Sequence, residues 1–124
     1  MPKRADTQVY VSLVTAGGVS EYDEKTGEVI NASFITGLNA PNELVLSGDI
    51  LFVANEGGSV GKYDAKTGAA ISQSFITGPA PVGLALSGGD LFVANGDGTV
   101  GKYNARTGKV INADFITGWA QGYL

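Results

Sequence analysis

Short apolar runs alternate with turn residues along almost the whole chain. Residues 82–86 and 91–94 are apolar and are separated by a Ser-Gly-Gly-Asp turn signal, and residues 99–103 and 110–117 follow with further strand-like patterns. No segment carries a 3.6-residue apolar period long enough for an amphipathic helix. The pattern therefore predicts short β-strands joined by tight turns.

The pattern repeats. Residues 51–80 and 91–120 are identical at 19 of 30 positions when they are aligned with an offset of 40, and residues 19–37 match the same unit less closely. Each complete unit holds four predicted strands in about 40 residues, which is typical of one propeller blade. The sequence thus predicts an all-β propeller chain with three four-stranded blades.

The first unit differs from the other two. If the strands are lettered a to d from the propeller axis outward, blade 2 (about 42–78) and blade 3 (about 82–118) are complete, whereas blade 1 (about 8–37) begins at strand b, roughly residues 8–13. Residues 120–124 occupy the position of a strand a. The predicted order is bcd, abcd, abcd, a, with residues 1–7 as a frayed tail and 8–124 as one three-blade unit.

Three blades cannot close a ring, because closed propellers usually have about four to eight. An open arc would expose apolar sheet faces and an unpaired strand edge. Two chains would supply six blades around a two-fold axis, so we expect a homodimer in which the tail of each chain completes blade 1 of the other. The expected interface residues are Val9, Tyr10, Val11, Trp119, Ala120, Gln121, Gly122, Tyr123 and Leu124.

A family resemblance supports the blade assignment. The run LFVANGDGTVGKYNARTGKVI and the turn formed by residues 64–68 resemble the blade repeats of pyrroloquinoline-quinone-type propellers, and are similar to repeats of NHL-type bacterial propellers. The resemblance implies a propeller fold over residues 8–120. Quinoprotein blades usually carry a tryptophan after the Thr-Gly turn, where this chain has Asn31, Ser72 and Asn112, so we expect no quinone and no other cofactor.

Composition narrows the possible chemistry. The chain has a formal net charge of −4 and only one basic cluster, at Lys3 and Arg4, which disfavours nucleic acid as a partner. It has no cysteine and no histidine, which removes thiolate chemistry and the commonest general base and metal ligand. No apolar run approaches the ~18 residues of a membrane span, and no signal-peptide pattern opens the chain. We expect a soluble chain without a membrane partner, and the sequence indicates no compartment.

Several repeated residues have structural interpretations. Asp23, Asp64 and Asn104 are expected to cap Thr-Gly turns rather than bind metal. Three tyrosines recur within strand c and are expected to pack between blades: Tyr22, Tyr63 and Tyr103. Three phenylalanines at repeated positions are expected to be core residues: Phe34, Phe75 and Phe115. Asn55 and Asn95 end strand b and are expected to hydrogen-bond the backbone of the b–c loop. We predict no catalytic residue and no metal site.

The b–c and d–a loops are expected to share one face of the propeller. The candidate ligand-binding residues on that face are Asn42, Glu43, Asn55, Glu56, Asn95, Asp97 and Trp119. Trp119 is interpreted first as an interface residue and second as a ligand anchor. A binding or interaction scaffold is the preferred function. Two alternatives remain: a lactonase- or lyase-type propeller enzyme with a carboxylate and asparagine metal site, and a fragment or engineered propeller with no evolved ligand.

Overall fold

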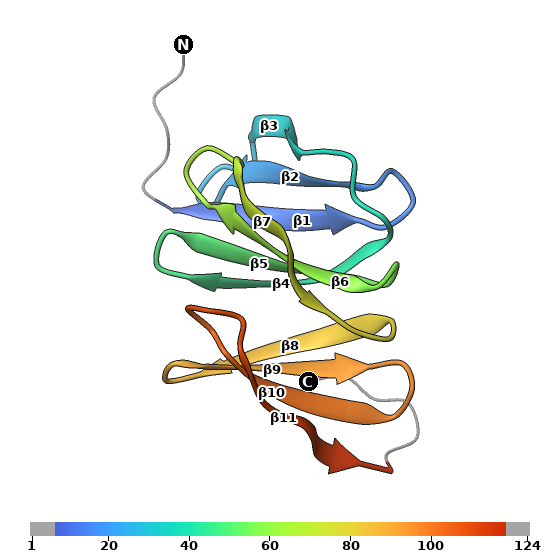
Figure 1. The fold of residues 1–124 in the computed structure, drawn as a ribbon. Coiled ribbons are helices and arrows are strands. Elements are labelled where there is room, and N and C mark those ends of the chain that lie inside the picture. Colours follow the sequence, from blue (N-terminus) through green and yellow to red (C-terminus); the bar gives the residue numbers. More distant parts are fainter. Residues whose placement is uncertain (1–6, 119–124) are drawn as a thin grey trace.

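The computed structural model describes residues 7–118, which form three antiparallel sheets stacked along the chain (Figure 1). The first sheet consists of β1 (Gln8–Leu13), β2 (Gly18–Asp23) and β3 (Val29–Ile35). The second consists of β4 (Pro41–Ser47), β5 (Ile50–Asn55), β6 (Ser59–Asp64) and β7 (Ala70–Thr77). The third consists of β8 (Pro81–Ser87), β9 (Asp90–Asn95), β10 (Thr99–Asn104) and β11 (Val110–Thr117). Within this range no helix is present that could cross a membrane.

The sheets have the predicted strand order. Blades 2 and 3 are four-stranded meanders, and blade 1 has three strands that correspond to b, c and d. The bounds predicted for the first and last described strands, 8–13 and 110–117, are confirmed. The expected strand at 120–124 and the expected tail, apart from Thr7, lie outside the described residues. Thr7 itself donates a hydrogen bond from its hydroxyl to the Glu24 carboxylate.

The Thr-Gly turns form as predicted. In blade 2, Asp64 Oδ1 accepts hydrogen bonds from the backbone N–H groups of Lys66 and Thr67, at 2.8 and 3.2 Å. Asp23 and Asn104 accept the equivalent pairs of bonds in the other two blades. Gly68 closes the turn at a φ of 78°, a conformation that favours glycine.

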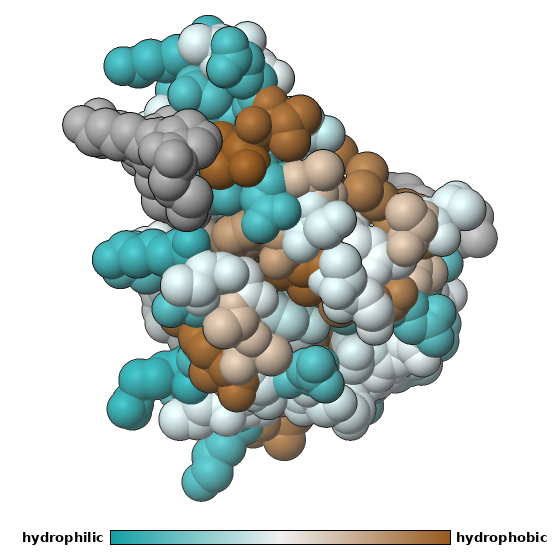
Figure 2. All heavy atoms as spheres, turned by 90° about the horizontal axis from the view of Figure 1, so that it is seen from above, coloured by the Kyte–Doolittle hydropathy of each residue, from teal (hydrophilic) through white to brown (hydrophobic). Residues whose placement is uncertain are grey.

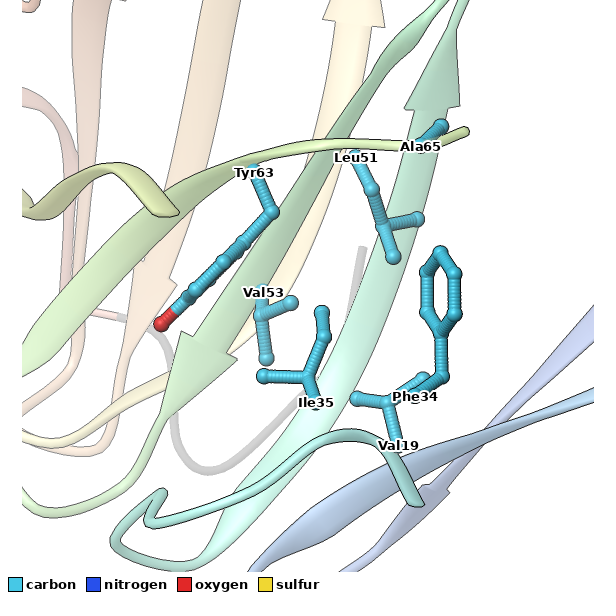
Figure 3. Packing of buried hydrophobic residues seen from close by; sticks show 7 residues of the cluster. All are labelled: Val19, Phe34, Ile35, Leu51, Val53, Tyr63 and Ala65. Carbon is cyan, nitrogen blue, oxygen red and sulfur yellow. The ribbon is translucent and has the colours of Figure 1, made fainter. Parts of the chain in front are cut away.

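The apolar core lies between the sheets. Figure 3 shows the cluster between blades 1 and 2, in which Val19, Phe34 and Ile35 of blade 1 face Leu51, Val53, Tyr63 and Ala65 of blade 2. A second cluster lies between blades 2 and 3. In it, Phe52 and Ala54, on the opposite side of β5, pack with Leu91 and Val93 of β9. The alternation of β5 residues between the two clusters follows from the two-residue period of a strand. The middle sheet, formed by β4 to β7, is therefore apolar on both faces.

Residues at equivalent positions of successive blades are buried only where another sheet packs on their blade. Phe34 and Ile35 in β3 are 7% and 5% exposed, and Ile76 in β7 is 5% exposed. Phe115 and Ile116 in β11 are 45% and 46% exposed, because no described sheet covers the outer face of blade 3. The prediction that Phe115 is a core residue is thus wrong for the single chain.

Candidate functional site

The b–c and d–a loops lie at the same end of the sheets, and two of the predicted site residues meet there. The Asn42 side chain donates a hydrogen bond from Nδ2 to Glu56 Oε1 at 2.9 Å. This contact joins the start of β4 to the loop between β5 and β6. Glu56 is exposed, so the pair presents an amide and a carboxylate to solvent.

Asn55 and Asn95 lie deeper, at the ends of β5 and β9, and are only 4% and 3% exposed. Asn95 Nδ2 donates to the side-chain hydroxyl of Thr99 at 3.2 Å, so the prediction that this side chain bonds the loop backbone is wrong. The loop is closed instead by the backbone, where the Gly98 N–H donates to the Asn95 carbonyl oxygen at 3.1 Å. The Oδ1 atoms of both asparagines have no hydrogen-bond partner among residues 7–118. Both side chains are therefore parts of the interior rather than of the loop surface.

The b–c loops of blades 2 and 3 differ although the strands beside them repeat. In blade 3, Asp97 Oδ1 accepts hydrogen bonds from the N–H and the hydroxyl of Thr99, at 3.1 and 2.7 Å. In blade 2 the equivalent residue is Gly57, and a Cβ atom there would lie 2.4 Å from Nδ2 of Asn39. The preceding d–a loop is one residue longer in blade 2, and Asn39 fills the space that the glycine leaves.

Glu43 lies in β4, half-buried, opposite Ala54 of β5. Partial burial raises the pKa of the Glu43 carboxyl above its ordinary value. Burial likewise raises the pKa of the Tyr63 and Tyr103 phenols, and the Asp114 carboxylate adds to the effect at Tyr103. Both phenols thus stay neutral and serve as packing groups.

The predicted interface residues fall into three groups. Val9 and Val11 are 44% and 39% exposed on the outer face of blade 1. Tyr10 points the other way: its ring lies 5.5 Å from that of Phe34, and its hydroxyl donates to the Ala65 carbonyl oxygen at 2.8 Å. Tyr10 therefore joins blades 1 and 2 within the chain. Trp119 and residues 120–124 lie outside the described residues.

A crevice between blades 2 and 3 was not anticipated from the sequence. Its volume is about 390 Å³, and it opens at the end opposite the b–c loops. The charged residues on its walls are Lys62 and Arg106. A comparison of the turn residues of the blades could have indicated this crevice. Asp49 and Asp64 of blade 2 are replaced by Gly89 and Asn104 in blade 3, which removes two carboxylates.

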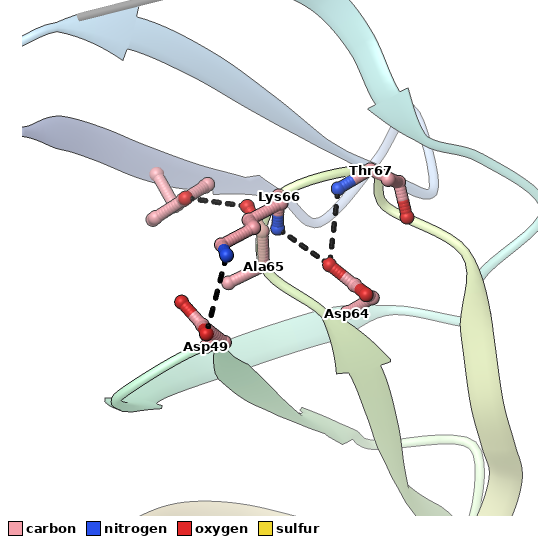
Figure 4. Close-up of polar contacts among 6 residues, drawn as sticks. Asp49, Asp64, Ala65, Lys66 and Thr67 are labelled. Atoms are coloured by element: carbon pink, nitrogen blue, oxygen red, sulfur yellow. Dashed lines mark hydrogen bonds and ion pairs between the residues drawn. The ribbon is translucent and has the colours of Figure 1, made fainter. Parts of the chain in front are cut away.

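At the equivalent junction between blades 1 and 2 the charges are different. Figure 4 shows Lys66 paired with Asp49, with 3.4 Å between Nζ and Oδ2, beside the Asp64 turn. Glu21 of blade 1 is also buried at this junction, at the position that Lys62 occupies in blade 2. Over the described part of the chain, no three acidic side chains gather closely enough to hold a metal ion.

One three-stranded and two four-stranded antiparallel sheets, stacked face to face in a chain of repeats, define this molecule as a β-propeller protein. The sequence profile of the family described as outer membrane protein assembly factor BamB matches residues 15–111. The chain belongs to this family of quinoprotein-type propeller repeats, and the predicted resemblance is confirmed.

Solved structures agree on the fold. The computationally designed Ika4 protein superposes with a TM-score of 0.72 at 17% identity, over 95% of this chain and 72% of its own. The designed Ika8 protein gives a TM-score of 0.64 at 18% identity, over 88% of this chain. A europium-containing methanol dehydrogenase gives 0.59 at 19% identity, over 86% of this chain. The chain spans 34% of the Ika8 chain and 23% of the dehydrogenase. No curated protein matches it in sequence.

Proposed function

We propose that this chain is a self-assembling propeller scaffold, in which two copies close a six-bladed ring and present the b–c and d–a loops to a partner. The observation that carries the proposal is the burial of equivalent residues at successive blades. Ile35 and Ile76 are each 5% exposed because a sheet follows, whereas Ile116 is 46% exposed. A further sheet packed on blade 3, as blade 3 packs on blade 2, would bury Ile116 as Ile35 and Ile76 are buried.

Blade 1 offers such a face. Its outward residues Val9 and Val11 correspond by strand register to Leu51 and Val53, which pack against blade 1 inside the chain. Both valines are exposed, and Figure 2, which views the molecule from the side of blade 1, shows apolar residues among hydrophilic ones on this surface. Docking blade 1 of one copy on blade 3 of another would therefore repeat an interface that the chain already contains.

The turn glycines support the same arrangement. A Cβ atom at Gly68 would lie 2.4 Å from the Phe34 carbonyl oxygen, and one at Gly108 would lie 2.7 Å from that of Phe75, so each turn packs closely on the preceding blade. Gly27 is the equivalent residue of blade 1 and has nothing within 4 Å. Its turn has a similar φ of 74°, and in the proposed ring it would pack on the Phe115 carbonyl oxygen of a second copy.

The edge of β1 that faces away from β2 has a proposed partner strand. β5 and β9 each pair with two strands, whereas β1 pairs with β2 alone among the described strands. We expect residues 120–124 of the second copy to pair with this edge as strand a. Deleting residues 119–124 should then abolish the ring.

The scaffold role is supported by the loops. Residues 51–80 of blade 2 and 91–120 of blade 3 are identical at 19 of 30 positions, and the loops differ at Asn39, Gly57 and Asp97. Variable loops on a repeated frame are typical of recognition surfaces. Substituting Glu56 or Asp97 by the corresponding amide should leave the ring mass unchanged, because neither side chain lies at the proposed junction.

Light scattering coupled to size exclusion tests the ring directly. The chain should elute with twice its own mass, and Ile116→Glu should convert it to a monomer. Ile111→Glu is the matched control: Ile111 is 52% exposed, and its counterpart Ile71 stays 51% exposed even though blade 3 follows it. A monomer mass for the unmodified chain, or equal effects of the two substitutions, would contradict the proposal.

A further inference from the structure

The crevice between blades 2 and 3 has the dimensions of a small-molecule site. Its volume of about 390 Å³ lies within the range of ligand pockets, about 300–1,000 Å³. Ile50 and Phe52 of β5 form an apolar wall, and the two glycines of the β8–β9 turn, Gly88 and Gly89, leave the entrance open.

The charge of this crevice is opposite to that of the equivalent junction between blades 1 and 2. The equivalent positions there hold three carboxylates, of Glu21, Asp49 and Asp64, and one ammonium group, of Lys66. Between blades 2 and 3 these positions are Lys62, Gly89, Asn104 and Arg106, which give two cations and no carboxylate. The same backbone hydrogen bond joins the turns in both places, from Ala65 to Asp49 at 2.8 Å and from Ala105 to Gly89 at 2.9 Å, and the charges differ because the side chains differ.

The turns of blade 3 do not require glycine at position 89 or asparagine at position 104 in place of aspartate. Asn104 Oδ1 accepts hydrogen bonds from the N–H groups of Arg106 and Thr107 at 2.9 and 3.0 Å, as the Asp64 carboxylate does in blade 2. Gly89 has no positive φ, and a Cβ atom there would have nothing within 4 Å, so an aspartate would fit as it does at position 49. The exchanges remove two negative charges without a structural cause.

The two cations have unused hydrogen-bond donors. Lys62 Nζ donates to the Arg106 carbonyl oxygen at 3.1 Å and lies 4.7 Å from the centre of the Phe75 ring, which leaves two of its three N–H donors. Within residues 7–118 the Arg106 guanidinium forms no ion pair, whereas Lys66 at the equivalent position pairs with Asp49. Arginine and lysine together suit the oxygens of a carboxylate or a phosphate.

We propose that the crevice between blades 2 and 3 binds a small organic oxyanion, a carboxylate or a phosphate monoester that carries an apolar group. The oxygens contact Lys62 and Arg106, and the apolar group lies on Ile50 and Phe52. The site is complete within one chain, so it does not depend on the proposed ring.

Phenyl phosphate is a suitable probe, with inorganic phosphate and phenol for comparison. In nitrogen–proton correlation spectra of the full chain, the amide signals of Gly88 and Gly89 should shift saturably with phenyl phosphate. Inorganic phosphate should bind more weakly and phenol weakest, because each lacks one half of the recognised group. Equal binding of all three compounds, or no saturable shift at these glycines, would overturn the proposal.

A charge-restoring variant gives the sharpest comparison. The double substitution Gly89→Asp and Asn104→Asp gives this crevice the aspartates that the junction between blades 1 and 2 carries, and should weaken phenyl phosphate binding at least about tenfold, as should Arg106→Gln. Lys66→Gln removes a cation from the junction between blades 1 and 2 and should leave binding unchanged.

Unchanged binding in the double variant, or loss of binding in Lys66→Gln, would place the anion elsewhere. The same titration on Ile116→Glu separates this proposal from the ring, since a monomer should bind the probe equally well.

Discussion

The phenol of Tyr10 donates a hydrogen bond to the backbone carbonyl oxygen of Ala65 across 2.8 Å, from the first strand of blade 1 to the c–d turn of blade 2. Tyr10→Phe keeps the ring on Phe34 but removes this donor, so it should lower the free energy of unfolding by about 0.5–1.5 kcal/mol. Urea denaturation measures the change. Tyr22→Phe is the control, because the Tyr22 hydroxyl accepts its hydrogen bond from Ser20 within its own sheet. An equal cost for both substitutions would contradict a role in joining the blades.

Gly68→Ala should destabilise the chain more than Gly27→Ala. Both glycines have positive φ, which costs an alanine about 1–2 kcal/mol. At Gly68 the new methyl group would also collide with the Phe34 carbonyl oxygen, whereas Gly27 has open space. Denaturation at a protein concentration low enough to favour the single chain measures the difference. Equal midpoints would show that the blade-to-blade contact at Gly68 adds nothing.

Asn95→Ala should cost about 1 kcal/mol, because it removes the hydrogen bond to the Thr99 hydroxyl from a buried position. Asn55→Ala should cost less, since the Nδ2 atom of Asn55 lies 3.5 Å from its acceptor, the Val53 carbonyl oxygen. Thermal unfolding of the two variants tests the order. An unchanged midpoint for Asn95→Ala would indicate that this side chain is kept for another purpose, such as contact with a ligand.

Glu43→Gln should stabilise the fold at neutral pH. Burial raises the pKa of Glu43 in the folded chain above its ordinary 4.5, so folding favours the protonated carboxyl. That contribution to stability is fully present below the ordinary pKa and is lost as the pH rises through the folded pKa. The melting temperature of the variant should thus exceed that of the unmodified chain at pH 7, and the gap should narrow as the pH falls to about 4. A gap that does not vary with pH would contradict this account.

The strands were predictable from the sequence because their signals are local. Alternating apolar residues and turn glycines placed the ends of β1 and β11 correctly. The exposure of Phe115 was not predictable from its repeat, because the same residue type is buried or exposed according to whether another sheet covers it. The meeting of Lys62 with Arg106, 44 positions apart, likewise depends on how one blade packs on the next. Local patterns carry no information about that packing.

Each blade presents different residues on its two faces, as the split of β5 between Phe52 on one side and Leu51 on the other shows. A stack of such blades has a polarity, because its two end faces differ. In the proposed ring, copies would therefore add in a single orientation. Such addition would stop only where curvature brings the last end back to the first, and a substitution that opened the curvature would turn the proposed ring into a fibre.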